Sequence, residues 1–97
     1  MSKLKKTETE YPKKFTLTSG KEVELLEIAK GKHSVKAQEI TRGDQYKFSY
    51  ALACQLCKID GRLLTMEDIL ELPIVDASEL VLIAMTGSLE AEEMGND

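Results

Sequence analysis

Apolar and polar residues alternate in two short segments near the start of the chain. Residues 15–18 and 22–25 both follow this period of two, which is typical of β-strands, and a Ser-Gly pair lies between them. A two-residue loop would place the apolar residues of one strand opposite glutamates of the other, so the loop must have an odd length. A three-residue loop ending at Gly20, which adopts a left-handed conformation there, pairs Phe15 with Val23 on one buried face. The pattern predicts an N-terminal β-hairpin.

Four helical segments are expected after the hairpin, and capping residues mark the start of the first two. Ser34 is a good helix N-cap and Gly43 a good stop, so the first helix is expected between them. Asp44 caps the second helix, whose apolar residues at 46–57 surround most of its circumference. We therefore expect the second helix to be the central and most buried element.

Turn and cap residues also mark the boundaries of the later elements. An Asp-Gly turn ends the central helix, a threonine caps a two-turn helix that ends at a proline, and an aspartate caps the last helix. These signature residues are, in order, Asp60, Gly61, Thr65, Pro73 and Asp76. The last helix is expected to end at Gly87. The predicted fold class is α+β, an N-terminal β-hairpin followed by about four short helices.

The chain has 97 residues, of which 42% are apolar, and this suffices for one small core. Residues 1–13 are rich in lysine and almost free of apolar side chains, so we expect a mobile basic arm there. Residues 90–97 are acidic and are expected to form a loose tail. A single α+β domain is therefore predicted at residues 14–89.

Charge is distributed unevenly along the chain, although the formal net charge is only -4. Residues 1–48 hold eleven Lys and Arg against seven acidic residues, whereas residues 49–97 hold two against ten. A nucleic-acid surface would therefore lie in the first half, where Lys30, Lys32 and Lys36 cluster. The expected last helix contains no Lys, Arg, Asn or Gln to contact base edges, which argues against a DNA-recognition helix.

Cys54 and Cys57 have the spacing of a redox or metal-binding pair. They lie at the C-terminal end of the expected central helix, where the helix dipole raises the pKa of a thiol instead of lowering it. Packing as small buried hydrophobic residues is the better interpretation, and free thiols fit a reducing cytoplasm. The longest apolar run, Leu80 to Met85, is too short for a membrane span, so no membrane contact is expected.

The other candidate groups for catalysis or ligand binding lack partners in the sequence. His33, the only histidine, is expected in an exposed lysine-rich loop without the further ligands that zinc requires. Glu67, Asp68 and Glu71 share one short helix, where capping and the helix dipole account for acidic residues. The glycines form no phosphate-binding loop. We therefore predict no catalytic residue, no metal site and no cofactor, and we do not expect an enzyme.

The last helix is apolar around much of its circumference. Ala77, Leu80, Val81 and Ala84 define the side turned toward the core, and Leu82 and Ile83 lie outside it. A small domain does not normally cover a helix on every side, so these two residues are either buried under another element or part of a docking surface. Leu82 and Ile83 are therefore the candidate partner-binding residues.

Several short motifs between the lysine-rich connector and the last helix occur in a familiar order. They are Lys-Gly-Lys at 30–32, Ala-Leu-Ala-Cys-Gln-Leu-Cys at 51–57, Ile-Asp-Gly at 59–61, Leu-Thr at 64–65, Glu-Asp-Ile at 67–69, Leu-Pro at 72–73 and Asp76. In this order and spacing the chain resembles the small tail assembly chaperones of contractile-tailed bacteriophages, of the Mu-like and E-protein type. With the hairpin, the resemblance covers about residues 15–87. Leu63 departs from it, because a proline or polar residue is expected after the turn.

The resemblance implies a non-enzymatic protein made by a phage or prophage in the cytoplasm of the bacterial host. Such chaperones bind the tape-measure protein, which is long, apolar and helical, and keep it soluble during tail assembly. The signature residues carry over as structural positions only. The apolar last helix would either pair with a second copy or receive a tape-measure segment. A small DNA-binding regulator that uses the basic N-terminal half is the alternative, and a thiol enzyme is a third class.

Overall fold

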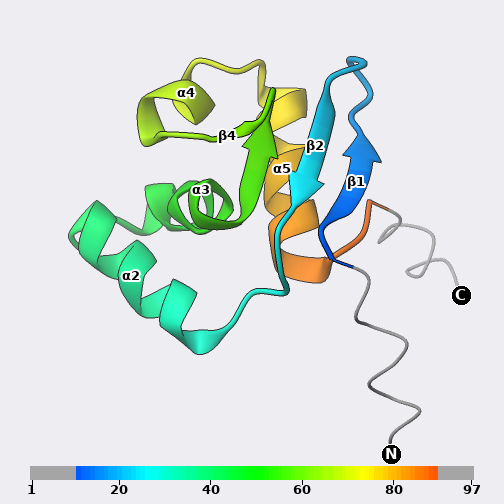
Figure 1. The fold of residues 1–97 in the computed structure, drawn as a ribbon. Coiled ribbons are helices and arrows are strands. Elements are labelled where there is room, and N and C mark those ends of the chain that lie inside the picture. The colour runs from blue at the N-terminus through cyan, green and yellow to red at the C-terminus, as the bar shows by residue number, and fades with distance from the viewer. Residues whose placement is uncertain (1–10, 90–97) are drawn as a thin grey trace, which may run out of the picture.

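The computed structural model describes residues 11–89, which form one antiparallel sheet and four helices (Figure 1). In chain order the elements are β1 (Lys13–Thr16), β2 (Glu22–Leu25), α2 (Gly31–Thr41), α3 (Gln45–Leu56), β3 (Cys57–Ile59), β4 (Arg62–Leu63), α4 (Met66–Leu70) and α5 (Ile74–Thr86). The strands are adjacent in the order β1-β2-β3-β4. The predicted α+β class, with an N-terminal hairpin and about four helices, is confirmed.

The first hairpin has the register that the alternation predicts. Phe15 lies opposite Val23, and residues 18–20 form the loop. Gly20 has a φ of +100°, a conformation that glycine adopts easily and a β-branched residue does not. A backbone hydrogen bond of 2.8 Å between the residues that flank the loop closes it. The predicted loop length and the predicted role of Gly20 are confirmed.

A second hairpin, which the sequence pattern does not predict, completes the sheet. Asp60 and Gly61 join β3 to β4, and both have positive φ, 57° and 80°, as a tight two-residue turn requires. β3 also pairs with β2, where Cys57 lies opposite Leu25. The expectation that the central helix includes Cys57 is therefore wrong, since the helix ends at Leu56. Strands of three and two residues are too short to show alternation.

The helices lie on one face of the sheet, and α3 is central among them (Figure 1). It contacts α2, α4 and α5, as its apolar circumference predicts. Val23 and Leu25 of β2 share one buried cluster with residues of α3 and α5. On the other face, Lys14, Glu24 and Lys58 occupy neighbouring positions of β1, β2 and β3. Charges of alternating sign therefore cross this solvent-facing side of the sheet.

Two predicted helix starts and one predicted helix end are confirmed. The Asp44 carboxylate accepts the N–H of Tyr46 at 2.9 Å at the start of α3. At the start of α4, the Thr65 hydroxyl accepts the Asp68 N–H and the Asp68 carboxylate accepts the Thr65 N–H, which is a complete capping box. Gly87 ends α5 in the left-handed conformation.

Two other predicted caps are wrong, because their helices begin earlier. Ser34 lies inside α2, whose cap position is Lys30, and the Lys30 N–H donates to Nδ1 of His33 at 2.9 Å. Asp76 lies in the first turn of α5, whose cap position is Pro73. Proline favours a helix start because its φ is already helical and its missing N–H needs no partner there. Pro73 therefore separates α4 from α5 without a longer loop.

The folded domain begins before its predicted boundary. Lys13 starts β1, and its Nζ donates to the carbonyl of Gly87 at 3.3 Å. Tyr11 packs against the core cluster, so it also belongs to the domain. The other residues predicted as a basic arm (1–10) and those predicted as an acidic tail (90–97) lie outside the described residues.

Candidate functional site

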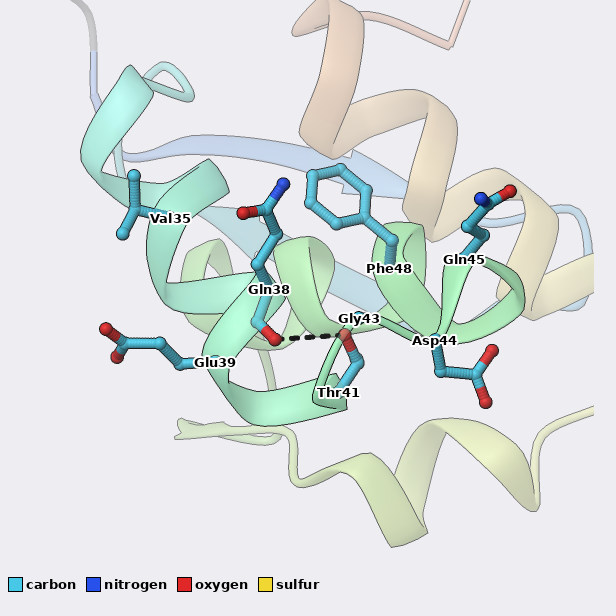
Figure 2. Close-up of a pocket in the computed structure, with 8 residues that line it drawn as sticks. All are labelled: Val35, Gln38, Glu39, Thr41, Gly43, Asp44, Gln45 and Phe48. Atoms are coloured by element: carbon cyan, nitrogen blue, oxygen red, sulfur yellow. Dashed lines mark hydrogen bonds between the residues drawn. The ribbon is translucent and has the colours of Figure 1, made fainter.

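A groove of about 870 Å³ lies between α2 and α3 (Figure 2). The turn between these helices contains Arg42 and Gly43, both with left-handed backbone at φ 54° and 83°, so the chain reverses and the helices pack side by side. At the end of α2, the Thr41 hydroxyl donates to the Ala37 carbonyl at 2.9 Å. The groove is lined by Val35, Gln38, Glu39, Thr41, Gly43, Asp44, Gln45 and Phe48.

The groove combines apolar surface with a polar, acidic edge. Val35 is 59% exposed, and Phe48 packs partly against the core. Figure 2 shows Phe48 and Gln38 pointing toward one another between the helices, whereas Glu39 and Asp44 point outward. The eight lining residues include two carboxylates and no Lys or Arg. This arrangement suits an elongated apolar segment that carries basic or amide donors along its sides.

The sequence pattern does not predict this groove, because apolar residues at 46–57 indicate burial. The first half of α3 extends beyond the core, so Tyr46 is 93% exposed, and all the buried residues of the helix lie in its second half. Ile40 of α2 is also exposed. The available signal was the short Arg-Gly-Asp turn, which places two helices side by side. The shape of the groove depends on how those helices pack.

α5 holds the two predicted partner-binding residues in different environments. Ile83 is 0% exposed and belongs to the core cluster, so its prediction as a docking residue is wrong. Its burial has a physical reason: α3 and the sheet share that cluster with α5, which widens the buried side beyond Ala77, Leu80 and Ala84. Leu82 is half-buried and borders an exposed side of the helix. Val81 is also only half-buried, so its expected place on the core side is wrong: the buried side of α5 is centred nearer to Asp76 and Ile83.

The exposed side of α5 carries apolar residues at both ends of the helix. Ile74 is 74% exposed, and Val75 and Met85 are each more than half exposed. The sequence pattern does not identify Ile74 and Val75 as helical, because Asp76 resembles a helix cap. Pro73 was the signal that could have placed the start correctly.

The loop of the first hairpin contacts the beginning of α5. The Thr18 N–H donates to the Glu79 carboxylate at 2.9 Å, and the Thr18 hydroxyl donates to its other oxygen. Lys21 Nζ lies 3.4 Å from Oδ2 of Asp76, whose side chain is 1% exposed. Asp76 Oδ1 has no hydrogen-bond partner among the described residues. These contacts hold the hairpin loop on the helix and are structural.

Cys54 and Cys57 are both buried, as predicted. Burial raises the pKa of Cys54 to about 11, with a smaller contribution from the Asp68 carboxylate. Burial also raises the pKa of Cys57 to about 12, with a further contribution from Cys54. Cys54 Sγ contacts Met66 Sδ at 3.9 Å. Both thiols stay protonated at neutral pH, where the thiolate is the reactive form, so they act as packing groups.

His33 is 6% exposed and helical, so its prediction as an exposed loop residue is wrong. Its Nδ1 accepts the Lys30 N–H, and its Nε2 lies 3.5 Å from a carboxylate oxygen of Glu27. The Lys30 ammonium lies 3.4 Å from the other oxygen and, chiefly through a hydrogen bond, lowers the pKa of Glu27. The histidine therefore fixes the start of α2. Lys32 and Lys36 remain exposed on this helix.

The acidic residues of α4 serve the structure of that segment. The Asp68 carboxylate accepts the Thr65 N–H and a hydrogen bond from Arg62 Nη1 at 3.1 Å. The pKa of Asp68 is lowered mainly by the backbone hydrogen bond from Thr65. Glu67 lies in the first turn of the helix and Glu71 at its end. Within residues 11–89, no group of three or more His, Cys, Asp or Glu side chains is arranged to hold a metal ion.

Comparisons of the chain with protein-family models, with characterised proteins and with solved structures give no significant match. Among the helices of residues 11–89, none is both long enough and apolar enough to cross a membrane. The geometry described above makes the α2–α3 groove and the exposed side of α5 the candidate functional surfaces of the described domain.

Proposed function

We propose that the protein is a phage or prophage tail assembly chaperone, which binds the tape-measure protein while the tail is built and catalyses no reaction. The proposal is supported by the resemblance of about residues 15–87 to that family. The observation that carries it is the α2–α3 groove, which is open, partly apolar and acidic at its edge. A tape measure that is long, apolar and helical contains helical segments whose apolar side could bind in such a groove.

An amphipathic helix could enter the groove with its apolar side. Residues three or four positions apart on such a helix would contact Val35 and Phe48, as in other helix-in-groove complexes. Lys or Arg on its flanks would face Glu39 and Asp44. Because the groove is open, a long helix bound in it could continue beyond either end.

A single substitution on the wall of the groove tests this proposal. Val35→Glu places a charge where an apolar side chain would dock, while Val35 is exposed enough for the domain to stay folded. The chain is co-expressed with the tape-measure protein of the same tail gene cluster, and the soluble tape measure that co-purifies is measured. We expect Val35→Glu to reduce that amount about tenfold or more, since burying an unpaired charge is costly.

Ile28→Glu is the matched control, because Ile28 is 55% exposed in the connector before α2 and does not line the groove. It should bind the tape measure like the wild-type chain. Both variants should keep the wild-type circular dichroism spectrum and urea midpoint. A tape measure that stays insoluble with the wild-type chain, or binds both variants equally, would contradict the proposal.

The alternative, a small DNA-binding regulator, has weaker support. Lys32 and Lys36 are exposed on α2, but α5 would present apolar residues to a DNA groove. Duplex DNA binding that falls steeply with rising salt, and that weakens when Lys32 and Lys36 become glutamine, would favour the regulator over the chaperone.

A further inference from the structure

The exposed side of α5 forms a continuous surface that we call the α5 stripe. Ile74, Val75 and Met85 are strongly exposed, Val81 and Leu82 are half-exposed, and Ser78 is exposed between them. The stripe contains no charged residue, since Asp76 is buried and Glu79 binds Thr18 at its margin. A surface of this kind on a small protein marks a contact site.

Four apolar residues of the stripe are placed symmetrically about Ser78, and Met85 lies outside this symmetric set. Ile74 lies four positions before the serine and Leu82 four positions after it. Val75 and Val81 lie three positions before and after it. Offsets of three and four are the ridge spacings by which helices pack. Two antiparallel copies of α5 would therefore match each isoleucine with a leucine and each valine with a valine.

Ser78 occupies the centre of this pattern, where two such helices would approach most closely. Its small side chain permits close contact at the axis of a two-fold interface, in which the same patch faces itself. An unrelated partner helix would place no symmetry requirement on the stripe.

Charge at the ends of α5 also favours the antiparallel arrangement. Glu71 is exposed just before the helix begins, and Lys13 binds the carbonyl of Gly87 where it ends. In an antiparallel pair about Ser78, Glu71 of each copy would lie beside Met85 of the other copy, near the end of α5 where Lys13 is bound. The uncharged stripe brings no like charges together between these ends.

We propose that a second copy of this chain covers the α5 stripe, with the two α5 helices antiparallel and the two-fold axis at Ser78. A 13-residue helix is only about 20 Å long, so the buried area lies at or below the low end of specific interfaces. The dimer is therefore weak and reversible, with a dissociation constant on the order of micromolar. The proposal does not depend on what binds the α2–α3 groove.

Sedimentation equilibrium tests the dimer with the full chain. The apparent mass of the wild-type protein should rise from 10.8 kDa toward twice that value as its concentration increases. Ser78→Glu and Ser78→Lys should each raise the dissociation constant about tenfold or more, because each places like charges at the axis. An equimolar mixture of the two variants should associate again, because opposite charges then meet. Unchanged circular dichroism spectra and urea midpoints show that both variants stay folded.

Cross-linking tests the position of the axis. A cysteine at Ser78 would face its own counterpart, so Ser78→Cys should form a disulfide-linked dimer under mild oxidation. Ser19→Cys, in the exposed hairpin loop, is the matched control and should cross-link much more slowly. The native Cys54 and Cys57 are buried and do not compete.

Three results would overturn the proposal. The first is a wild-type chain that stays monomeric up to millimolar concentration. The second is a Ser78→Glu and Ser78→Lys mixture that associates no better than either variant alone. The third is a monomeric wild-type chain whose tape-measure binding is lost in Ser78→Glu, which would assign the stripe to a different partner. Failure of the chaperone proposal is recognised separately, by the Val35→Glu experiment.

Discussion

The two sides of α5 differ much less in residue type than in surroundings. On one side Leu80 and Ile83 are completely buried in the core cluster. On the other side Ile74 and Leu82, which are equally apolar, are exposed or half-exposed. The neighbouring elements, not the composition of the helix, create this difference. Apolar content thus identifies a helix that makes contacts, and the tertiary structure decides which of those contacts are internal.

Glutamate substitutions on the two sides should have the most divergent effects. Leu80→Glu buries an unpaired charge in the core, which costs more than a small domain can tolerate, so the protein should unfold. Leu82→Glu should keep its helical circular dichroism and a nearly unchanged urea midpoint, because its side chain can reach water. Unfolding by Leu82→Glu as complete as that by Leu80→Glu would show that the half-exposed side also belongs to the core.

The hairpin loop on the flank of α5 provides the next test. Gly20→Val should destabilise the domain by about 1–2 kcal/mol or more, because a β-branched residue tolerates the left-handed backbone poorly. Ser19→Val is the matched control, since Ser19 has no positive φ, and it should change stability much less. Urea unfolding measures both. An unchanged midpoint for Gly20→Val would mean that the loop adopts another conformation.

Removing the partner of the buried Asp76 should have a smaller effect. Lys21→Met leaves the carboxylate without its ammonium and should cost on the order of 1 kcal/mol, because Lys21 is half-exposed and water can partly replace it. Lys58→Met, on the open face of the sheet, should cost less. Equal urea midpoints for the two variants would show that the contact at 3.4 Å between Lys21 and Asp76 contributes nothing.

The rate of thiol alkylation distinguishes a buried cysteine from an exposed one without altering the core. The pKa of Cys54 is raised to about 11 and that of Cys57 to about 12, so little thiolate is present at pH 8, and less at lower pH. A cysteine introduced by Ser19→Cys in the exposed hairpin loop should have an ordinary pKa and should be alkylated about a hundredfold faster or more. Rapid alkylation of the native thiols in folded protein would show that this part of the core opens readily.

Local interactions explain which elements the sequence predicts. The phase of the alternation determines the register of the first hairpin, because each side chain has only two faces available. Asp44 and Thr65 cap helices through hydrogen bonds to residues two or three positions away, so their roles are visible in the sequence. The Asp60-Gly61 turn is visible for the same reason, although the short strands that it joins are not.

Features that depend on distant residues are not predictable in this way. Ser34 and Asp76 have the chemistry of helix caps, but Lys30 with His33 and Pro73 start those helices earlier. The α2–α3 groove, like the burial of Ile83 and the exposure of Tyr46, depends on how the helices pack on the sheet. Of the two candidate partner-binding residues, only Leu82 remains partly on the surface.

The position of α3 between α2 and α5 has a consequence for valency. Because α3 separates the groove from the α5 stripe, a ligand in the groove leaves the stripe free (Figure 1). A pair of chains joined through α5 would present two grooves to one long ligand. The second contact would then be intramolecular, and avidity could exceed the affinity of one groove by about 10²–10⁴. Each contact would still release rapidly, so such a dimer could be displaced from its ligand one groove at a time.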